Sequence, residues 1–395
     1  MSESRFQVGQ FFVGDTPAID FGLGAQAQGD AAFALDRQFA VVHRLAEIYT
    51  ARASMLLLLD LGLGPKLRAG ATLPDLCSAF HANSHHAIEW LLAFAECHDL
   101  LDRSGERYLL KGEPDLGLEN IRHLASAEAP GHEAVFRLVD AVREKIAPFF
   151  MEGASGEALL FDQTLFPIWL EYFRNENLVY RINNFFPMVG VRKDLLDDST
   201  ILELGGGVGS FVQLLAQDAK GKSYSHKISQ YIFSDVAPAF LRTAQRAFPS
   251  LGIEFPLKYK LLNINKNLVG QGVEPNSLDV VIAVNVLHVA DRLPDTLSDI
   301  RTVLKPGGRL VFGECIKPYL NKPIYVEFFF QFMSSFTNVS TDSLLRPAYG
   351  FLESGHWVEL LKHSGYSNIE EIPITKPIVK LIPTFYTGAF SAQSF

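Results

Sequence analysis

Cysteine is scarce in this sequence of 395 residues, and its scarcity excludes two kinds of site. The three cysteines, Cys77, Cys97 and Cys315, are an odd number and lie far apart. They do not form the close pairs of a zinc site, and they do not suggest a framework of disulfides. We therefore expect a reducing compartment and no metal ion.

The sequence also lacks a long uncharged apolar run and an excess of positive charge. No run has the length that a membrane-spanning helix needs. Residues 1–5 lack the basic region and following apolar region that begin a signal peptide. The net charge of −9 disfavours a surface for nucleic acid. We expect a cytoplasmic protein with no membrane span and no nucleic-acid partner.

Aromatic residues are abundant instead, with 31 phenylalanines, and 48% of all residues are hydrophobic. A chain of this size and composition can form two or three domains with a sizeable core. The phenylalanines either fill that core or line a pocket for an apolar ligand, and composition leaves both interpretations open.

The most informative stretch is 200–217, in which a short apolar run precedes three alternate glycines and a helical spacing. Ile201–Leu204 is typical of a strand, and Gly205, Gly207 and Gly209 are typical of the turn that follows. This unit places a nucleotide-like ligand at a helix N-terminus, where glycine permits close approach or positive φ. The alternative is an ordinary tight turn of an α/β protein.

Ser210 discriminates between the cofactors that such a turn can bind. A dinucleotide-binding turn requires glycine at this position, so a nicotinamide-dependent oxidoreductase is only a remote alternative. Glu203 followed by Gly205, Gly207 and Gly209 resembles the first motif of class I S-adenosylmethionine-dependent methyltransferases. The resemblance implies S-adenosyl-L-methionine as the cofactor, and this molecule has no phosphate for an anion-binding nest.

Polar residues follow the next two strands. Asp235 ends the run 231–235, where an acid can accept both ribose hydroxyls or cap the helix that begins near Pro238. Asn263 stands where the family often carries an acid near the adenine, and its amide still offers a donor and an acceptor. The expected cofactor-binding residues are Glu203, Gly205, Gly207, Gly209, Asp235, Asn263 and Asn285.

His288 and Glu314 follow two further strands, 280–284 and 309–314. Because neighbouring parallel strands end at one edge of a sheet, we expect both side chains at the rim where such sheets bind ligands. A carboxylate fixes the tautomer of an imidazole and strengthens it as a base. His288 is therefore a candidate general base oriented by Glu314. The alternative is a structural histidine beside a solvated glutamate.

Three segments, 201–209, 233–238 and 285–314, resemble the methyltransferase domain of polyketide synthases. In that family the His and Glu at the positions of His288 and Glu314 form the catalytic dyad, so the resemblance implies the same catalytic roles here.

The N-terminal part has a different pattern. Apolar periodicity predicts helices over 36–60, 73–80 and 85–99, followed by a hairpin over 100–110 that turns at Ser-Gly. This order is typical of a winged helix, but residues 84–96 contain no Lys or Arg for phosphate contacts. The pattern resembles the dimerisation domain of small-molecule O-methyltransferases and implies a homodimer, in which the apolar helices 36–60 and 85–99 are expected to pack against a second copy of the chain. The histidines at 81, 85 and 86 lack the partners of a metal cluster.

Alternating strands and helices from residue 200 onward predict an α/β fold. The fold class is a Rossmann-like seven-stranded methyltransferase domain, preceded by a mostly helical winged-helix dimerisation domain. Weaker strands are expected at 368–372 and 385–390. We divide the chain into an irregular arm (1–32) with a winged-helix domain (1–112 together), a helical connector that covers the site (113–195) and a catalytic domain (196–395).

The segment Tyr325–Met333 is strongly aromatic and precedes a Ser/Thr-rich stretch, 334–343. It either covers an apolar acceptor and excludes water or forms a packed core helix. The sequence thus predicts a methyltransferase of specialised metabolism that acts on an apolar small molecule or a carrier-bound, polyketide-like intermediate. Free-standing winged architecture slightly favours an oxygen acceptor; the alternative is a C-methyltransferase acting on an activated carbon.

Overall fold

The computed structural model describes residues 12–13, 16–17, 20–113, 116–381 and 385–395. Its centre is a seven-stranded sheet in the order β11-β12-β10-β9-β6-β7-β8. All neighbouring pairs are parallel except those of β12 with β10 and β11. The strands are β6 (Ser199–Leu204), β7 (Ile228–Asp235), β8 (Leu257–Leu261), β9 (Leu278–Val284), β10 (Leu304–Cys315), β11 (Tyr366–Ile372) and β12 (Thr387–Ser394).

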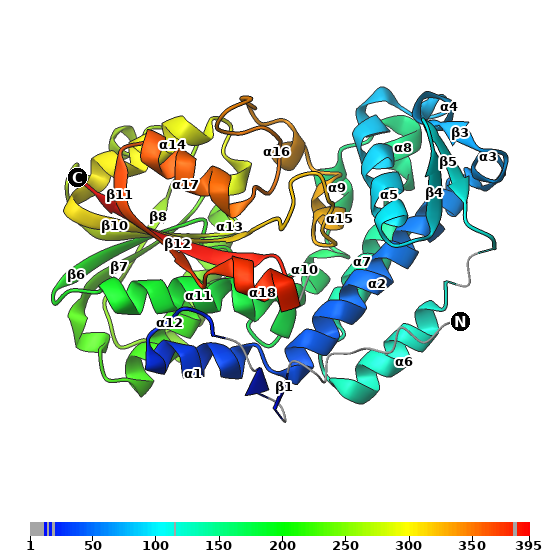
Figure 1. Cartoon of the computed structure of the whole chain (residues 1–395). Helices are drawn as coiled ribbons and strands as arrows, with labels where there is room; N and C mark the ends of the chain where they lie inside the picture. The colour runs from blue at the N-terminus through cyan, green and yellow to red at the C-terminus, as the bar shows by residue number, and fades with distance from the viewer. Residues whose placement is uncertain (1–11, 14–15, 18–19, 114–115, 382–384) are drawn as a thin grey trace.

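Helices cover both faces of this sheet (Figure 1). One face packs against α1 (Ala25–Ala34), α11 (Leu178–Asp194), α12 (Ser210–Gly221) and α13 (Pro238–Ala247). The other packs against α14 (Leu293–Val303) and α17 (Ser354–His363). Burial on both faces explains why residues 280–284 of β9 are a continuous apolar run rather than an alternating one. The predicted Rossmann-like α/β fold is confirmed.

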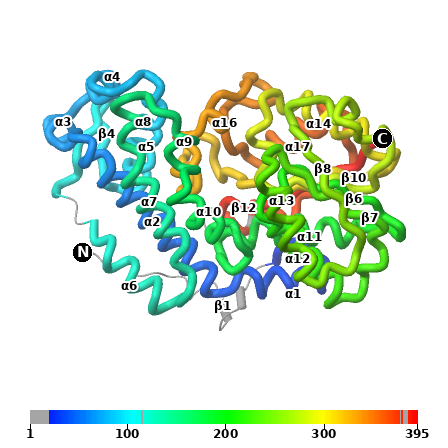
Figure 2. The backbone as a smooth tube through the Cα atoms, turned by 180° about the vertical axis from the view of Figure 1, so that it is seen from behind, coloured from blue at the N-terminus to red at the C-terminus, as the bar shows by residue number. Residues whose placement is uncertain are grey.

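The N-terminal lobe is mostly helical and lies beside the sheet lobe, as Figure 2 shows from behind. Its small sheet has the order β3-β5-β4, and the hairpin of β4 and β5 follows α4 and α5 in the predicted helix, helix, hairpin order. The predicted helices are present, although two of them end earlier than expected. The elements are α2 (Arg37–Asp60), α3 (Gly64–Ala69), β3 (Ala71–Thr72), α4 (Leu73–Cys77), α5 (His85–Cys97), β4 (Leu101–Ser104) and β5 (Arg107–Leu110).

The arm was expected to be irregular throughout 1–32, and this is wrong for its last part. Residues 25–34 form α1, which packs against α11 and joins the core beneath the sheet. Two short strands, β1 (Phe12–Val13) and β2 (Thr16–Pro17), pair with each other. Residues 1–11 of the arm lie outside the described residues.

The described residues of the region predicted as a helical connector form six helices, and these divide between the lobes. The last, α11, packs on β9, β10 and β12 and is thus a layer of the sheet lobe. It can approach β10 closely because a Cβ at Gly313 would lie 2.4 Å from Pro187 of α11. The others are α6 (Leu118–Glu128), α7 (Ala134–Lys145), α8 (Ala147–Glu152), α9 (Gly156–Leu160) and α10 (Phe166–Tyr172).

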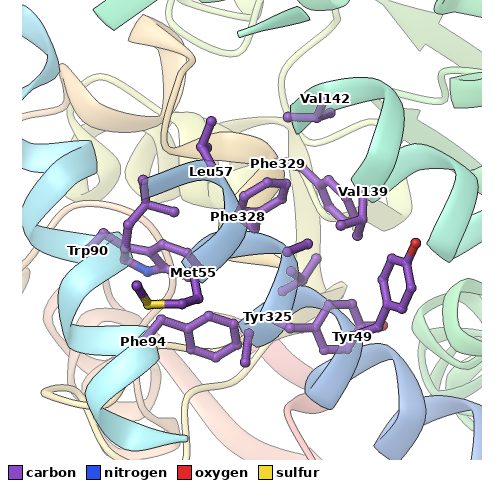
Figure 3. Close-up of a cluster of buried hydrophobic side chains, with 14 of the residues drawn as sticks. Tyr49, Met55, Leu57, Trp90, Phe94, Val139, Val142, Tyr325, Phe328 and Phe329 are labelled. Carbon is purple, nitrogen blue, oxygen red and sulfur yellow. The ribbon is translucent and has the colours of Figure 1, made fainter. Parts of the chain in front are cut away.

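The aromatic segment after β10 joins the two lobes. It contains one short helix, α15 (Glu327–Phe330), followed by α16 (Ser334–Thr337). Figure 3 shows Tyr325, Phe328 and Phe329 among side chains of the N-terminal lobe such as Trp90. The core interpretation therefore holds for these three residues, whereas Phe330 and Met333 line a cavity.

The apolar sides of α2 and α5 are buried within the chain, in one cluster with α7. The expectation that these sides pack against a second copy of the chain is therefore wrong, and the homodimer stays a prediction. Among the described residues, none of the helices combines the length and apolar character needed to cross a membrane.

Candidate active site

The glycine turn between β6 and α12 is built by close packing. Gly205 and Gly207 have φ values of +63° and +53°, a region that side chains disfavour. A Cβ at Gly206 would lie 2.2 Å from the ring of Phe233. At Gly207 the nearest atom to a built Cβ is 4.0 Å away, so this glycine faces open space. The turn leaves its backbone accessible to a ligand.

The open space is part of a cavity of about 340 Å³ at the carboxyl ends of β6, β9 and β10. Parallel α/β sheets bind their ligands at this edge. Of the predicted site residues, the cavity is lined by Glu203, Gly205, Gly207, Asn285 and His288. Other lining residues come from the helical connector that we expected to cover the site, although the sequence singled out none of these side chains: Tyr172, Tyr180, Asn183 and Asn184 of α10 and α11.

Ser210, which separated the cofactor alternatives in the sequence, links the turn to the helical cover. Its hydroxyl donates to the carbonyl of Phe173 at 2.6 Å, and its own carbonyl accepts from Asn175 Nδ2 at 2.7 Å. The cover therefore docks directly on the first turn of α12. The sequence contained no signal for this contact, because partners so far apart along the chain meet only in the fold.

Glu203 is buried in β6 and accepts a hydrogen bond from the hydroxyl of Tyr231 at 2.7 Å. Burial raises the pKa of its carboxyl to about 8, although the Tyr231 bond works in the opposite direction. The carboxyl is thus readily protonated near neutral pH in the absence of a ligand. A bound cation would favour the charged form.

Three predicted cofactor residues do not line the cavity. Gly209 packs against Phe248, to which a Cβ would come within 2.5 Å. Asp235 lies next to the turn, and its carboxylate accepts the backbone N–H groups of Gly207 at 2.9 Å and Ala237 at 2.7 Å. Asn263 accepts from its own loop, from the N–H of Asn265. Their roles in cofactor binding stay predictions.

His288 and Glu314 lie together at the rim, as their strand positions predicted. His288 Nδ1 is 2.8 Å from Glu314 Oε2, and the backbone N–H of His288 donates to Glu314 Oε1 at 3.2 Å. Both side chains are buried. Because Nδ1 faces the carboxylate as a donor, Nε2 carries the lone pair that can accept a proton.

Aromatic rings surround this imidazole. Its centroid lies 4.7 Å from that of Phe351, 5.8 Å from Phe336 and 6.1 Å from Phe330. The same three phenylalanines line the cavity. The rings form an apolar wall beside the base, and such a wall suits an apolar acceptor and limits the access of water.

Two of the histidines at 81, 85 and 86, which lack the sequence partners of a metal cluster, form hydrogen bonds within the fold. His86 Nε2 lies 2.7 Å from the carbonyl of Gln331, and His81 Nδ1 accepts the N–H of Asn83. In the part of the chain that the structure describes, no three His, Cys, Asp or Glu side chains gather as metal ligands do.

Comparison with known proteins identifies one domain family. Residues 202–310 match the family described as "Methyltransferase domain". This range begins in β6 and ends in β10, so it contains the glycine turn, Asp235, Asn263 and His288. Glu314 lies four residues beyond it.

Curated relatives are large fungal synthases. The chain is 36% identical over 121 residues to highly reducing polyketide synthase 2 of Gibberella zeae, which is 30% of this chain and 5% of that protein. It is 25% identical over 256 residues to the squalestatin tetraketide synthase of a Phoma species, which is 64% of this chain and 9% of that protein. The chain therefore corresponds to a small part of each relative.

Solved structures share the fold over nearly the whole chain. The CurJ carbon methyltransferase superposes with a TM-score of 0.72 at 20% identity, over 89% of this chain and 92% of that one. The DszA carbon methyltransferase gives 0.71 at 17% identity, over 94% of both. The trans-methyltransferase CalH, solved in complex with SAH, gives 0.60 at 20% identity, over 91% of both. The likeness includes both lobes.

Proposed function

We propose that this chain, which carries a class I S-adenosylmethionine-dependent methyltransferase domain resembling those of polyketide synthases, methylates an activated carbon of a polyketide-like acyl intermediate. The observation that carries the proposal is the buried pair His288 and Glu314, because His288 lines the same cavity as the glycine turn. Carbon is favoured over the oxygen acceptor that the sequence slightly favoured, because two of the structural relatives, CurJ and DszA, are described as carbon methyltransferases.

The cavity fits the cofactor at its glycine turn. Gly207 leaves open the space that a side chain would fill, and Glu203, Gly205 and Asn285 line the same space. Asp235 holds the turn through the N–H of Gly207, and its carboxylate oxygens retain lone pairs for ribose hydroxyls. The cofactor supplies a methyl group on a positively charged sulfur, which is a strong electrophile.

The chain's own groups prepare the acceptor. His288 Nε2 removes a proton from a carbon between two carbonyl groups, and Glu314 stabilises the imidazolium that results. The resulting carbanion would be the nucleophile for the methyl group that a cofactor held at the glycine turn would supply, and the demethylated thioether would be left behind. The chain's own part is to hold the acceptor carbon oriented toward the turn, which is the role of a rigid cavity.

A β-ketoacyl thioester combines the features that this site requires. Its carbon between two carbonyls is acidic enough for an imidazole base, and its acyl chain matches the wall of Phe330, Phe336 and Phe351. We propose such a thioester, free or held by a carrier domain, as the acceptor.

The first experiment tests the cofactor. Calorimetry should show that S-adenosylmethionine or its demethylated product binds and that NAD does not. The variant Asp235→Ala should bind more weakly by roughly 1–3 kcal/mol, the scale of a hydrogen bond to a charged group. Binding of NAD alone would contradict the assignment.

The second experiment tests the acceptor atom. The enzyme is incubated with the cofactor carrying a labelled methyl group and with the N-acetylcysteamine thioester of a β-keto acid. Label on the carbon between the carbonyls, located by NMR, is the expected result. Label on oxygen instead would support O-methylation and overturn the carbon proposal.

A further inference from the structure

Arg346 is a buried cation next to the dyad, and the reaction described above does not use it. Only 1% of its surface is exposed. It lies between α16 and α17, in the segment 338–351 that ends at Phe351 on the imidazole of His288. Burying a guanidinium costs hydration energy, so its partners must compensate for that loss.

Those partners are the backbone of the loop that carries His288. The guanidinium donates from Nη2 to the carbonyl of His288 and from Nη1 to the carbonyl of Ala290, both at 2.6 Å. Among the described residues, no carboxylate forms an ion pair with Arg346, and its Nε has no hydrogen-bond partner. The two terminal nitrogens of Arg346, which we call the fork, thus both bind one short loop, η6 (Leu287–Val289), and its end.

Together with Glu314, this fork holds every polar atom of His288 except the reactive one. Glu314 takes the backbone N–H and Nδ1, and Arg346 takes the carbonyl. Nε2 alone remains for the acceptor. A residue held on both sides of its backbone cannot rotate its ring away from the cavity without breaking buried hydrogen bonds, which are costly to leave unsatisfied.

The segment that carries Arg346 is itself anchored. Asp342 and Arg346 exchange two backbone hydrogen bonds, of 2.8 and 3.0 Å, which close a compact turn. The N–H of Ser340 donates to the carbonyl of Asp291, just past the His288 loop, at 2.8 Å. The covering segment and the loop therefore form one unit, with Arg346 at its centre.

We propose that Arg346 is a positioning residue for proton abstraction, which fixes the loop of His288 and favours the neutral imidazole by its charge. The inference rests on the proposed function, in which His288 is the base. An imidazole displaced by 1 Å loses its alignment with the acceptor carbon, and a misplacement of that size can cost about 100-fold in rate.

The charge of Arg346 predicts a shift of the pH–rate profile that a role in packing alone would not produce. Ionisable groups that lie on the elements around His288 are Glu314 on β10, Glu203 on β6, Asp291 on its own loop, Tyr172 and Tyr180 on the cover, and Cys315. Arg346 is the cation among these described neighbours. Without it the imidazolium is more stable, so the acidic limb of the rate profile moves to higher pH.

The test compares three variants in the full-length enzyme. Arg346→Met removes the charge, Arg346→Lys keeps the charge but loses the fork, and Leu344→Ser is a control at an exposed position of the same segment.

With the β-ketoacyl thioester, Arg346→Met should lower kcat by about 100-fold and move the acidic limb of the pH–rate profile to higher pH, while calorimetric affinity for S-adenosylmethionine stays unchanged. Arg346→Lys should lower kcat without moving the limb. In the His288→Ala background, Arg346→Met should cause no further loss.

Nitrogen NMR of the imidazoles needs no methyl acceptor. It therefore tests the positioning role of Arg346 separately from the proposed methyl transfer. It should show one neutral tautomer for His288 in the wild type and a mixture in Arg346→Met. If the wild type transfers no methyl group but the tautomer changes as expected, the proposed function fails and the positioning role stands. Equal kcat, pH profile and tautomer in Arg346→Met and the wild type would overturn the inference. If Arg346→Met does not fold, Arg346→Lys takes its place in the test. An unchanged kcat in Arg346→Lys would then overturn the inference.

Discussion

At the scale of single residues, the site depends on how one imidazole and two carboxyl groups are buried. Glu314 is wholly buried yet satisfied by two donors of the same residue, His288. Glu203 is equally buried but has one strong donor, Tyr231, which is why burial dominates its pKa. Identical side chains thus acquire different chemistry from their hydrogen-bond partners.

The dyad leads to the first prediction. His288→Ala should lower turnover by about 10²–10⁴-fold, the usual contribution of a positioned base, while cofactor affinity stays nearly constant. Glu314→Gln should cost less, because the amide oxygen still accepts a hydrogen bond although the charge is lost. Steady-state kinetics together with calorimetry measures both effects. Near-normal turnover in His288→Ala would remove the base from the mechanism.

Glu203 leads to a prediction about stability and pH. Its pKa is raised to about 8 in the folded protein, above the 4.5 of an unperturbed glutamate, so the folded state binds more protons between these values. Stability in the absence of cofactor should therefore fall as the pH rises from about 4.5 to 8. Glu203→Gln, which cannot ionise, should flatten this part of the profile. Thermal unfolding across the pH range measures it, and an equally steep profile in the variant would contradict the prediction.

At the scale of elements, the turn between β6 and α12 shows why three consecutive glycines occur. A Cβ added at Gly205 would lie 2.5 Å from Val286, and a Cβ added at Gly206 would lie 2.2 Å from Phe233. Only Gly207 faces open space. The glycines therefore serve two purposes: two of them let β6, β7 and the loop after β9 approach one another, and one leaves space for a ligand.

Gly206→Ala should destabilise the protein by roughly 1–3 kcal/mol, the usual cost of overpacking, because the added methyl group meets the ring of Phe233. Gly221→Ala, at the end of α12, is the matched control, since nothing lies within 4 Å of its built Cβ. Chemical denaturation compares the two. Equal stability of both variants would show that the turn relaxes to admit a side chain.

At the scale of the whole molecule, the two lobes are joined by the aromatic segment after β10, whose Tyr325, Phe328 and Phe329 lie among side chains of the helical lobe (Figure 3). Glu327 on α15 is its polar anchor. Its carboxylate accepts from Trp90 Nε1 of the helical lobe at 3.0 Å and pairs with Lys317 beyond β10 at 3.1 Å. The anchor lies on the same short helix as Phe330, which lines the cavity, and so fixes the position of that ring.

Glu327→Gln should destabilise the protein by about 3–5 kcal/mol, because it leaves the buried ammonium of Lys317 without its counter-charge. The double variant with Lys317→Met should recover part of that loss. Asp295→Asn is the control, since its pair with Arg292 is exposed and should contribute about 1 kcal/mol or less. Denaturation measures all three, and an effect of Glu327→Gln no larger than that of the control would contradict the role of this anchor.

The sequence by itself determined the strands of the central sheet, the glycine turn and the meeting of His288 with Glu314. It could do so because strand periodicity is local, and because residues that end neighbouring parallel strands must share one edge. The methyltransferase resemblance depended on the same local segments.

Only the tertiary structure decided which side chains reach the cavity from elsewhere. The contacts of Ser210 with the cover, of Arg346 with the loop of His288 and of Glu327 with Trp90 join residues 37, 58 and 237 positions apart. No periodicity encodes such pairs, because they arise from the packing of elements that the chain connects only at a distance. For the same reason, helix α1 and the inward-facing sides of α2 and α5 differed from expectation: what covers an apolar face is a property of the assembled fold.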